Sequence, residues 1–285
     1  MRADRQPDGS SEVDYTVNPA TGFPWATGPR DLAVPLNSVL PAWDAIMGGL
    51  AATGILAADR HRMRTGEGQL IKLALSDVAF AMVGNLGRIA EVQVGGRDAE
   101  RDGNYLYGAF GHDFGTSDGR RVMIVALTGR QWTALIEVTE TAEAFRSLES
   151  VTGHDLSSED GRFGARDLIA AVLRPWFAAR TLDEVRAAFK DTGVSWGPYQ
   201  TFRQLVEEDP RASEANPLFS MLEQPGIGTY LVPASPLELT AAGRLPARPA
   251  PELGEHTEEI LAGVLGLGEA EIGRLFDAGT VAAPS

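Results

Sequence analysis

The stretch of residues 39–77 constrains the fold more than any other part of the sequence. Its centre, residues 45–58, is an apolar run rich in glycine and alanine, which predicts a helix. Each glycine lowers helix propensity, so close packing in a crowded α/β core must offset that loss. The near-continuous apolar residues 69–75 follow a glycine-containing turn and predict a buried strand. A second helix is expected over residues 77–91, so the stretch predicts the order helix, turn, strand, helix.

Asp44 stands directly before the first of these helices. As an N-cap, its carboxylate would accept backbone N–H bonds at the positive end of the helix dipole. The same position would also keep a carboxylate nucleophile ionised. Aspartate is among the preferred cap residues, so the residues alone favour capping and leave the nucleophile as the alternative. Asp77 is the corresponding expected cap of the second helix.

Composition excludes several classes of function. The formal net charge of −14 argues against a nucleic-acid-binding face, although a local basic pocket can still hold an anionic ligand. The absence of cysteine rules out disulfides, thiolate nucleophiles and Cys-ligated metals, and it fits a cytoplasmic location. The apolar run at residues 45–58 is too short to cross a bilayer, so no membrane partner is predicted. The polar residues 1–15 do not resemble a signal peptide.

A polar, glycine-containing segment at residues 94–103 predicts a domain boundary. The Asp118-Gly119 pair beyond it is a strong signal for a hairpin turn. The strands expected in this second part lie at residues 110–116, 121–127 and 194–199. The helices expected there lie at residues 128–138, 162–179, 181–191 (opened by a Thr181 and Glu184 capping box) and 201–208. This order predicts a small α+β domain.

The two ends of the chain give weaker signals. Residues 13–17 are a short strand candidate, and the proline-rich residues 21–35 predict a loop anchored by Phe23 and Trp25. Residues 216–250 read as short strands and loops, and residues 254–265 and 269–278 as two closing helices. The sequence contains no phosphate-binding loop or zinc-protease motif. Its four histidines lie far apart without metal-ligand spacing, so no metal is predicted.

Taken together, several motifs resemble the family III CoA-transferases, the CaiB/BaiF type. The central match is an Asp, a small-residue helix, an Arg, a T-G-x-G-Q turn and a later Leu-Ser-Asp, which correspond here to Asp44, residues 45–58, Arg60, residues 65–69 and residues 75–77. Further agreement lies at Gly103-Asn104 with its aromatic loop, Asp118-Gly119, residues 208–210, and residues 250–257 with the closing helices. The resemblance covers most of the chain.

The resemblance changes the interpretation of Asp44, because it occupies the family's catalytic aspartate position. It implies that Asp44 attacks an acyl-CoA thioester to give a mixed anhydride, and then carries CoA as an aspartyl thioester. Coenzyme A would enter as part of the substrate, so no separate cofactor is expected. The resemblance also places substrate or CoA contacts at Tyr15, Asn104, Tyr107, Gly108 and Gly111. For Tyr15 and Tyr107, aromatic packing is the alternative.

The implied fold is α/β, with a partial Rossmann-like large domain, a smaller α+β domain, and a C-terminal segment that returns to the large domain. The corresponding divisions are residues 1–100, 101–220 and 221–285. The family's N-terminal Rossmann half is expected to be missing here, because residues 5–17 resemble the middle of that domain. Family members form interlocked homodimers, so a homodimer is expected if the full fold is present.

Within the family, residues 14–24, 103–114 and 126–132 most resemble members that move CoA from C1 to C4 within one mesaconyl group. The implied function is therefore an intramolecular transfer on mesaconyl-CoA. One alternative is an intermolecular transferase or racemase-like member that uses another acyl-CoA. A second alternative is a truncated, non-catalytic remnant or subunit.

Overall fold

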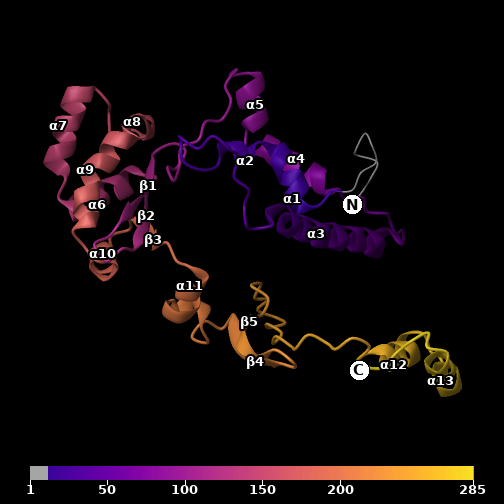
Figure 1. Ribbon diagram of the computed structural model, residues 1–285. Coiled ribbons are helices and arrows are strands. Elements are labelled where there is room, and N and C mark those ends of the chain that lie inside the picture. Colours follow the sequence, from indigo (N-terminus) through magenta and orange to yellow (C-terminus); the bar gives the residue numbers. More distant parts are fainter. Residues whose placement is uncertain (1–11, 285) are drawn as a thin grey trace. The chain divides into compact units, whose positions relative to one another are not determined.

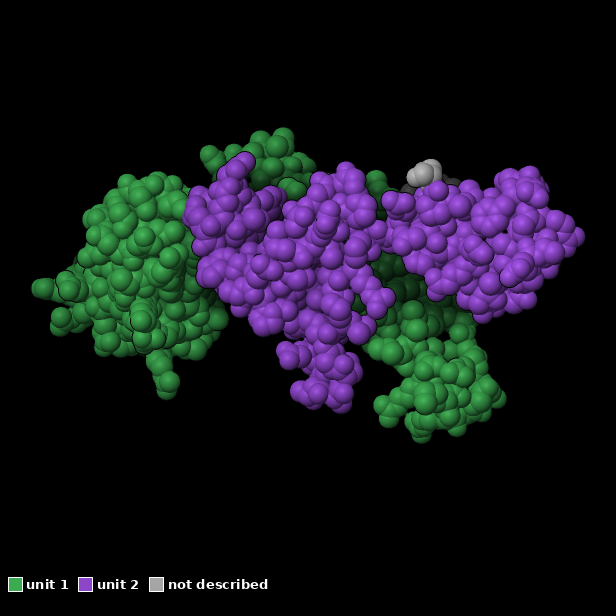
Figure 2. Space-filling view, turned by 90° about the horizontal axis from the view of Figure 1, so that it is seen from below, with its two compact units in different colours: residues 1–199 green, residues 200–285 purple. Residues whose placement is uncertain are grey.

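The computed structural model describes residues 12–284. The chain forms two compact units, Met1–Tyr199 and Gln200–Ser285, which Figure 2 shows in separate colours. Together they contain helices and small antiparallel sheets, in agreement with the α/β class predicted from the sequence. The three-part division at residues 1–100, 101–220 and 221–285 stays a prediction, as does the return of the last segment to a large domain.

The first part of unit 1 is helical (Figure 1). Its elements are α1 (Asp14–Val17), the 3-10 turn η2 (Asn18–Thr21), α2 (Phe23–Ala26), α3 (Ala42–Thr65), α4 (Leu75–Asn85) and α5 (Arg88–Gln93). A small apolar cluster of Val17, Trp43, Leu75 and Ala79 joins α1, α3 and α4. Gly66 ends α3 in the left-handed conformation at φ 81°, with its N–H bonded to the Arg62 carbonyl.

Two strands predicted for this region are wrong. Residues 13–17 form the short helix α1, and the expected loop that follows contains α2. Residues 69–74 are irregular, with Leu70 80% exposed, and Leu75 already belongs to α4. Within residues 12–109 the structure contains no strand, so residues 69–74 have no ladder to join. The helix predicted at 77–91 is two helices, because Gly87 adopts φ 81° between α4 and α5.

The second part of unit 1 is a three-stranded antiparallel sheet packed against helices. The strands are β1 (Phe110–Gly115), β2 (Arg121–Ala126) and β3 (Ser195–Pro198), in the order β1-β2-β3. The helices are α6 (Gly129–Thr139), α7 (Ala142–Thr152), α8 (Glu159–Gly164), α9 (Arg166–Ala178) and α10 (Leu182–Phe189). The main core lies between them, where Phe114 stacks on Phe177 with ring centroids 4.4 Å apart.

The local signals in this part are confirmed. Gly119 supplies the positive φ of 75° that the β1–β2 hairpin needs. Thr128 caps α6, and Thr181 with Glu184 forms the predicted capping box of α10. The helix predicted at residues 162–179 is interrupted at Ala165, which separates α8 from α9.

Unit 2 combines short helices with one hairpin. Its elements are α11 (Phe202–Glu208), η3 (Pro210–Ala212), β4 (Phe219–Gln224), β5 (Gly228–Pro233), α12 (Thr257–Glu259), the π-helical turn η4 (Ile260–Val264) and α13 (Glu269–Asp277). The predicted helix at 254–265 is thus shorter than expected, and that at 269–278 is confirmed as α13. Among residues 12–284, none of the helices has the length and apolarity that a bilayer crossing requires.

Candidate active site

Asp44 lies in the first turn of α3, where it is exposed. It is the third helical residue, so the predicted N-cap role of Asp44 is wrong. Pro41 holds the N-cap position and has neither an N–H nor a side-chain acceptor. Asp77 is displaced in the same way, since α4 begins at Leu75 with Ala74 as its cap residue. Both carboxylates remain within the first turn, where the helix dipole favours negative charge.

Another carboxylate takes over the cap of α3. The Oδ2 atom of Asp14 accepts the N–H of Trp43 at 2.8 Å and that of Asp44 at 3.3 Å. Asp14 is only 3% exposed. The remaining donors of the turn are also satisfied, because Ala42 N–H bonds to the Leu40 carbonyl and Ala45 N–H to the Pro41 carbonyl. An oxyanion formed at Asp44 would therefore need donors from outside this turn.

The side chain of Trp43 also anchors the first turn of α3. Its indole N–H donates to Asn18 Oδ1 at 3.0 Å, and Asn18 Nδ2 donates to Asn37 Oδ1 at 2.6 Å. The Phe23 ring packs against Trp43 at 5.9 Å between centroids. The turn that carries Asp44 is thus held by η2, α2 and the loop at residue 37.

The other residues predicted for the site fall into four places. Tyr15 is 52% exposed on α1, and its hydroxyl donates to the Val39 carbonyl at 3.3 Å, upstream of Asp44. Asn104 is exposed, and Tyr107 and Gly108 line a pocket described below. Gly111 is buried in β1 opposite Val125. The structure brings Tyr107 and Gly108 into one pocket, and Asp44 does not line it.

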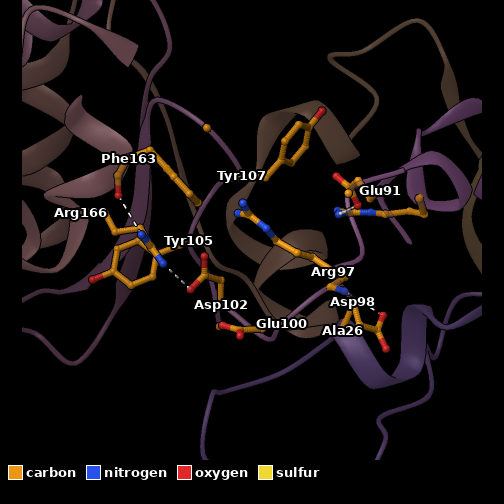
Figure 3. A pocket seen from close by; sticks show the side chains of 15 residues that line it. Ala26, Glu91, Arg97, Asp98, Glu100, Asp102, Tyr105, Tyr107, Phe163 and Arg166 are labelled. Carbon is orange, nitrogen blue, oxygen red and sulfur yellow. Dashed lines mark hydrogen bonds and ion pairs between the residues drawn. The ribbon is translucent and has the colours of Figure 1, made fainter. Parts of the chain in front are cut away.

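This pocket, of about 710 Å³, lies between α5, residues 95–108 and the α8–α9 region (Figure 3). The three arginines that line it differ in their ion-pair partners. Arg88 pairs with Glu91 at 2.7 Å, and Arg166 pairs with Asp102 at 3.1 Å. Arg97 has no ion-pair partner among the described residues, and its side chain points into the pocket in Figure 3. Glu91, Asp98, Glu100 and Asp102 outnumber the three arginines in the lining, so the pocket is polar and not basic.

An arginine-centred network ties the wall of this pocket to the first helical part. Arg30 bonds Asp102 at 2.7 Å and Asp167, at the start of α9, at 2.9 Å. The two carboxylates raise the pKa of the Arg30 guanidinium, and Arg30 lowers the pKa of Asp167. Burial, with a hydrogen bond to Asp167, raises the pKa of Tyr105 to about 12. Tyr105 therefore stays a neutral phenol throughout the physiological range.

A second, more apolar pocket of about 300 Å³ shares part of its wall with the first. Phe23, Val83, Ile89 and Val92 line it, and Ala26, Arg88, Glu91, Asp98 and Ala99 border both pockets. Sequence patterns had singled out Phe23 only as an anchor for a loop. The pairing of Asp14 with α3 had no local signal except Pro41, whose side chain offers no cap.

The described residues contain no group of three or more His, Cys, Asp or Glu side chains suited to a metal ion. Asp44 presents an exposed carboxylate on a turn held by Asp14 and Trp43. Such a group can attack a carbonyl and carry an acyl group covalently.

Comparisons with known proteins add a second line of information. A family model described as CoA-transferase family III matches residues 7–257. The chain is 57% identical over 277 residues to the 2-methylfumaryl-CoA isomerase of Chloroflexus aurantiacus, covering 97% of this chain and 68% of that protein. It is 30% identical to the succinyl-CoA:mesaconate CoA-transferase of Haloarcula marismortui, covering 89% of this chain and 61% of that protein.

A further relative is the succinyl-CoA–L-malate CoA-transferase alpha subunit of Chloroflexus aurantiacus, at 28% identity over 84% of this chain and 54% of that protein. The fold resembles the crystal structure of a CAIB/BAIF family protein from Brucella suis, with a TM-score of 0.68 at 20% identity. That match covers 91% of this chain and 65% of the other. The chain thus spans between about half and two thirds of the length of these proteins.

Proposed function

The chain belongs to CoA-transferase family III, and we propose that it transfers CoA between carboxylates with Asp44 as the nucleophile. The observation that carries this proposal is the exposed carboxylate of Asp44 on the first turn of α3, where the family resemblance predicts the catalytic aspartate. The dipole of this 24-residue helix stabilises negative charge there. A carboxylate is a weak nucleophile, but two covalent steps replace one difficult exchange.

The proposed chemistry proceeds in four balanced steps. The Asp44 carboxylate attacks the acyl-CoA thioester carbonyl, forming a mixed anhydride and releasing CoA thiolate. The thiolate attacks the aspartyl carbonyl, giving an aspartyl-CoA thioester and freeing the first carboxylate. The acceptor carboxylate attacks this thioester, which forms a second anhydride and releases the thiolate again. The thiolate then attacks the acceptor's acyl carbon, and Asp44 leaves as a free carboxylate.

For the substrate we propose mesaconyl-CoA, with CoA moving from C1 to C4 of one mesaconyl group. The support is the 57% identity to a protein named 2-methylfumaryl-CoA isomerase. Donor and acceptor would then belong to one molecule, so no free acid is required. The second candidate is intermolecular transfer, which the relative named succinyl-CoA:mesaconate CoA-transferase favours. Turnover with and without added free acid distinguishes the two.

The remaining parts of the proposal concern the surroundings of Asp44. Tyr15 stands beside Asp14 on α1 and is the binding residue with the clearest link to the Asp44 turn. Asn104, Tyr107, Gly108 and Gly111 are proposed to contact the acyl-CoA from the small α+β domain. We propose a homodimer in the cytoplasm, with coenzyme A entering only as part of the substrate.

The decisive experiment compares Asp44→Ala with Asp59→Ala. Asp59 is a second aspartate of α3, half-buried and paired with Arg62 at 2.6 Å, and serves as the matched control. With mesaconyl-C1-CoA as substrate, we expect Asp44→Ala to lose turnover by at least about 1,000-fold, because the covalent route disappears. Asp59→Ala should retain it.

Hydroxylamine provides an independent measurement, since it traps aspartyl anhydrides and thioesters as a hydroxamate. Peptide mass spectrometry should locate that mass change on Asp44 in the parent and find none in Asp44→Ala. Equal turnover by the parent and Asp44→Ala would refute the proposed nucleophile.

A further inference from the structure

Asp14 is a buried carboxylate, 3% exposed, at the start of α1. Among the described residues, no ion pair involves Asp14, and its side chain is bonded instead to the backbone of Trp43 and Asp44. A buried carboxylate is costly unless charge or hydrogen bonds compensate for it. The compensation here is the N-terminus of α3, whose free amides and dipole both favour a negative group.

The cap of α3 consequently comes from a residue 30 positions upstream. Pro41 offers no side-chain acceptor, and Asp44 itself points outward from the third helical position. Asn18, on the turn that follows Asp14, holds the Trp43 indole. Two adjacent residues of α3 are therefore fixed by two polar side chains from the α1–η2 segment.

We infer that Asp14 is a positioning residue for Asp44, acting through the backbone amides of Trp43 and Asp44. This inference rests on the proposed nucleophilic role of Asp44. The Asp14 carboxylate holds the first turn of α3 in one conformation. The Asp44 carboxylate then keeps one position and orientation from which it attacks the thioester carbonyl. Asp14 itself is only 3% exposed, so its side chain offers almost no surface for direct contact with a substrate.

A positioning role predicts a specific kinetic pattern. Asp14→Ala removes the acceptor and should slow formation of the Asp44 acyl-enzyme by about 10- to 100-fold, since small displacements of a reacting group cost this much. KM should change little, because the buried Asp14 side chain offers almost no surface to bound acyl-CoA. Asp14→Asn keeps one oxygen in place of the carboxylate and should recover most of the rate. A loss of stability alone would lower the fraction of folded protein and leave the rate per trapped active site unchanged.

Amide hydrogen exchange tests the cap without any assay of activity. In Asp14→Ala, the peptide containing Trp43 and Asp44 should exchange at least about 10-fold faster, because two protected amides lose their acceptor. Asp14→Asn should lie between this variant and the parent. Thr128→Ala is the matched control, since Thr128 caps α6 through its own side chain. It should accelerate exchange at the start of α6 and leave α3 unaffected.

The outcomes separate this inference from the proposed function. Unchanged exchange in Asp14→Ala overturns the inference, whatever the activity. Faster exchange with an unchanged rate per trapped site also overturns it, because the cap is then only structural. Turnover that survives Asp44→Ala, or a parent chain without turnover, refutes the proposed function and removes the role that Asp14 would serve. Faster exchange and a slower acyl-enzyme step in Asp14→Ala, with recovery of the rate in Asp14→Asn, together support the positioning role of Asp14.

Discussion

Gly111 shows how a single position can be assigned to two different roles. The family resemblance suggests a substrate contact, whereas the structure buries this glycine in β1. A Cβ atom placed on it would lie 2.9 Å from Leu106 Cβ and 3.4 Å from the Ile124 carbonyl oxygen. Neither the Leu106 Cβ atom nor the Ile124 carbonyl oxygen is the end of a flexible side chain. The backbone would therefore have to shift to make room for a methyl group at Gly111.

We therefore expect Gly111→Ala to destabilise unit 1 by about 1–3 kcal/mol, the usual cost of overpacking. Gly115→Ala is the control on the same strand, because its nearest contact is Arg121 Nη1 at an ordinary 3.8 Å. Chemical denaturation of both variants measures the difference. Equal midpoints would show that the Leu106 contact is relieved at no cost.

Asp44 illustrates what residue-level patterns can supply. Aspartate before a run of small residues predicted a helix start, and the helix is present. The pattern placed the start three residues late, because aspartate is favourable both at the cap and within the first turn. Nothing near Asp44 in sequence identifies Asp14 as the cap. Contacts between residues so far apart depend on tertiary packing, which local patterns do not encode.

At the level of elements, the predictions that depend only on neighbouring residues in the sequence are confirmed. The hairpin around Gly119 and the capped helices α6, α10 and α11 need only neighbouring residues, and each is present. The strand expected at residues 69–75 depended on a partner strand, and residues 12–109 provide none. Apolar runs without such a partner cannot be assigned to strands from periodicity alone.

Arg101 is one of the side chains that hold the loop between α2 and α3. The Arg101 guanidinium donates to the carbonyls of Trp25, Leu32 and Val34, and it stands 5.6 Å from the centre of the Trp25 ring. This fork of donors closes the loop onto the segment at residues 94–103.

We expect Arg101→Ala to increase cleavage by a nonspecific protease within residues 27–38 by at least about 10-fold, because several backbone bonds are lost together. Arg101→Lys should not restore protection, since an ammonium cannot reproduce the planar fork. Arg97→Ala is the matched control from the same segment. If Arg101→Ala were cleaved no faster than Arg97→Ala, the loop would be held by other contacts.

At the scale of the whole molecule, the two units differ in the groups that respond to acid. In unit 1, burial lowers the pKa of His112, which faces Asp113, Asp167, Arg121 and Arg174 and stacks on Tyr105 at 4.0 Å. Its Nδ1 atom is buried without a hydrogen-bond partner in the described part of the chain. In unit 2, a bidentate hydrogen bond from Arg211 holds the pKa of Asp209 well below its usual range.

The directions of these two pKa shifts predict that the two units lose stability over different pH ranges. His112 protonates more readily in the unfolded chain than in the folded one. The stability associated with neutral His112 is therefore complete above about pH 6.5 and declines as the pH falls toward its lower folded pKa. The stability that ionised Asp209 contributes is also lost as the pH falls. It is complete above about pH 4 and declines below that value. Unit 1 should thus begin to lose stability at a higher pH than unit 2.

Thermal unfolding between pH 3 and 8, followed by residue-resolved exchange in each unit, measures both windows. His112→Phe keeps a ring against Tyr105 and should flatten the pH dependence of the stability of unit 1 just below about pH 6.5. Asp209→Asn should flatten only the dependence of unit 2 below about pH 4. Each variant is the control for the other, because the two groups belong to different units. If unit 1 of a His112→Phe chain still lost stability as the pH fell just below about 6.5, that loss would belong to other groups.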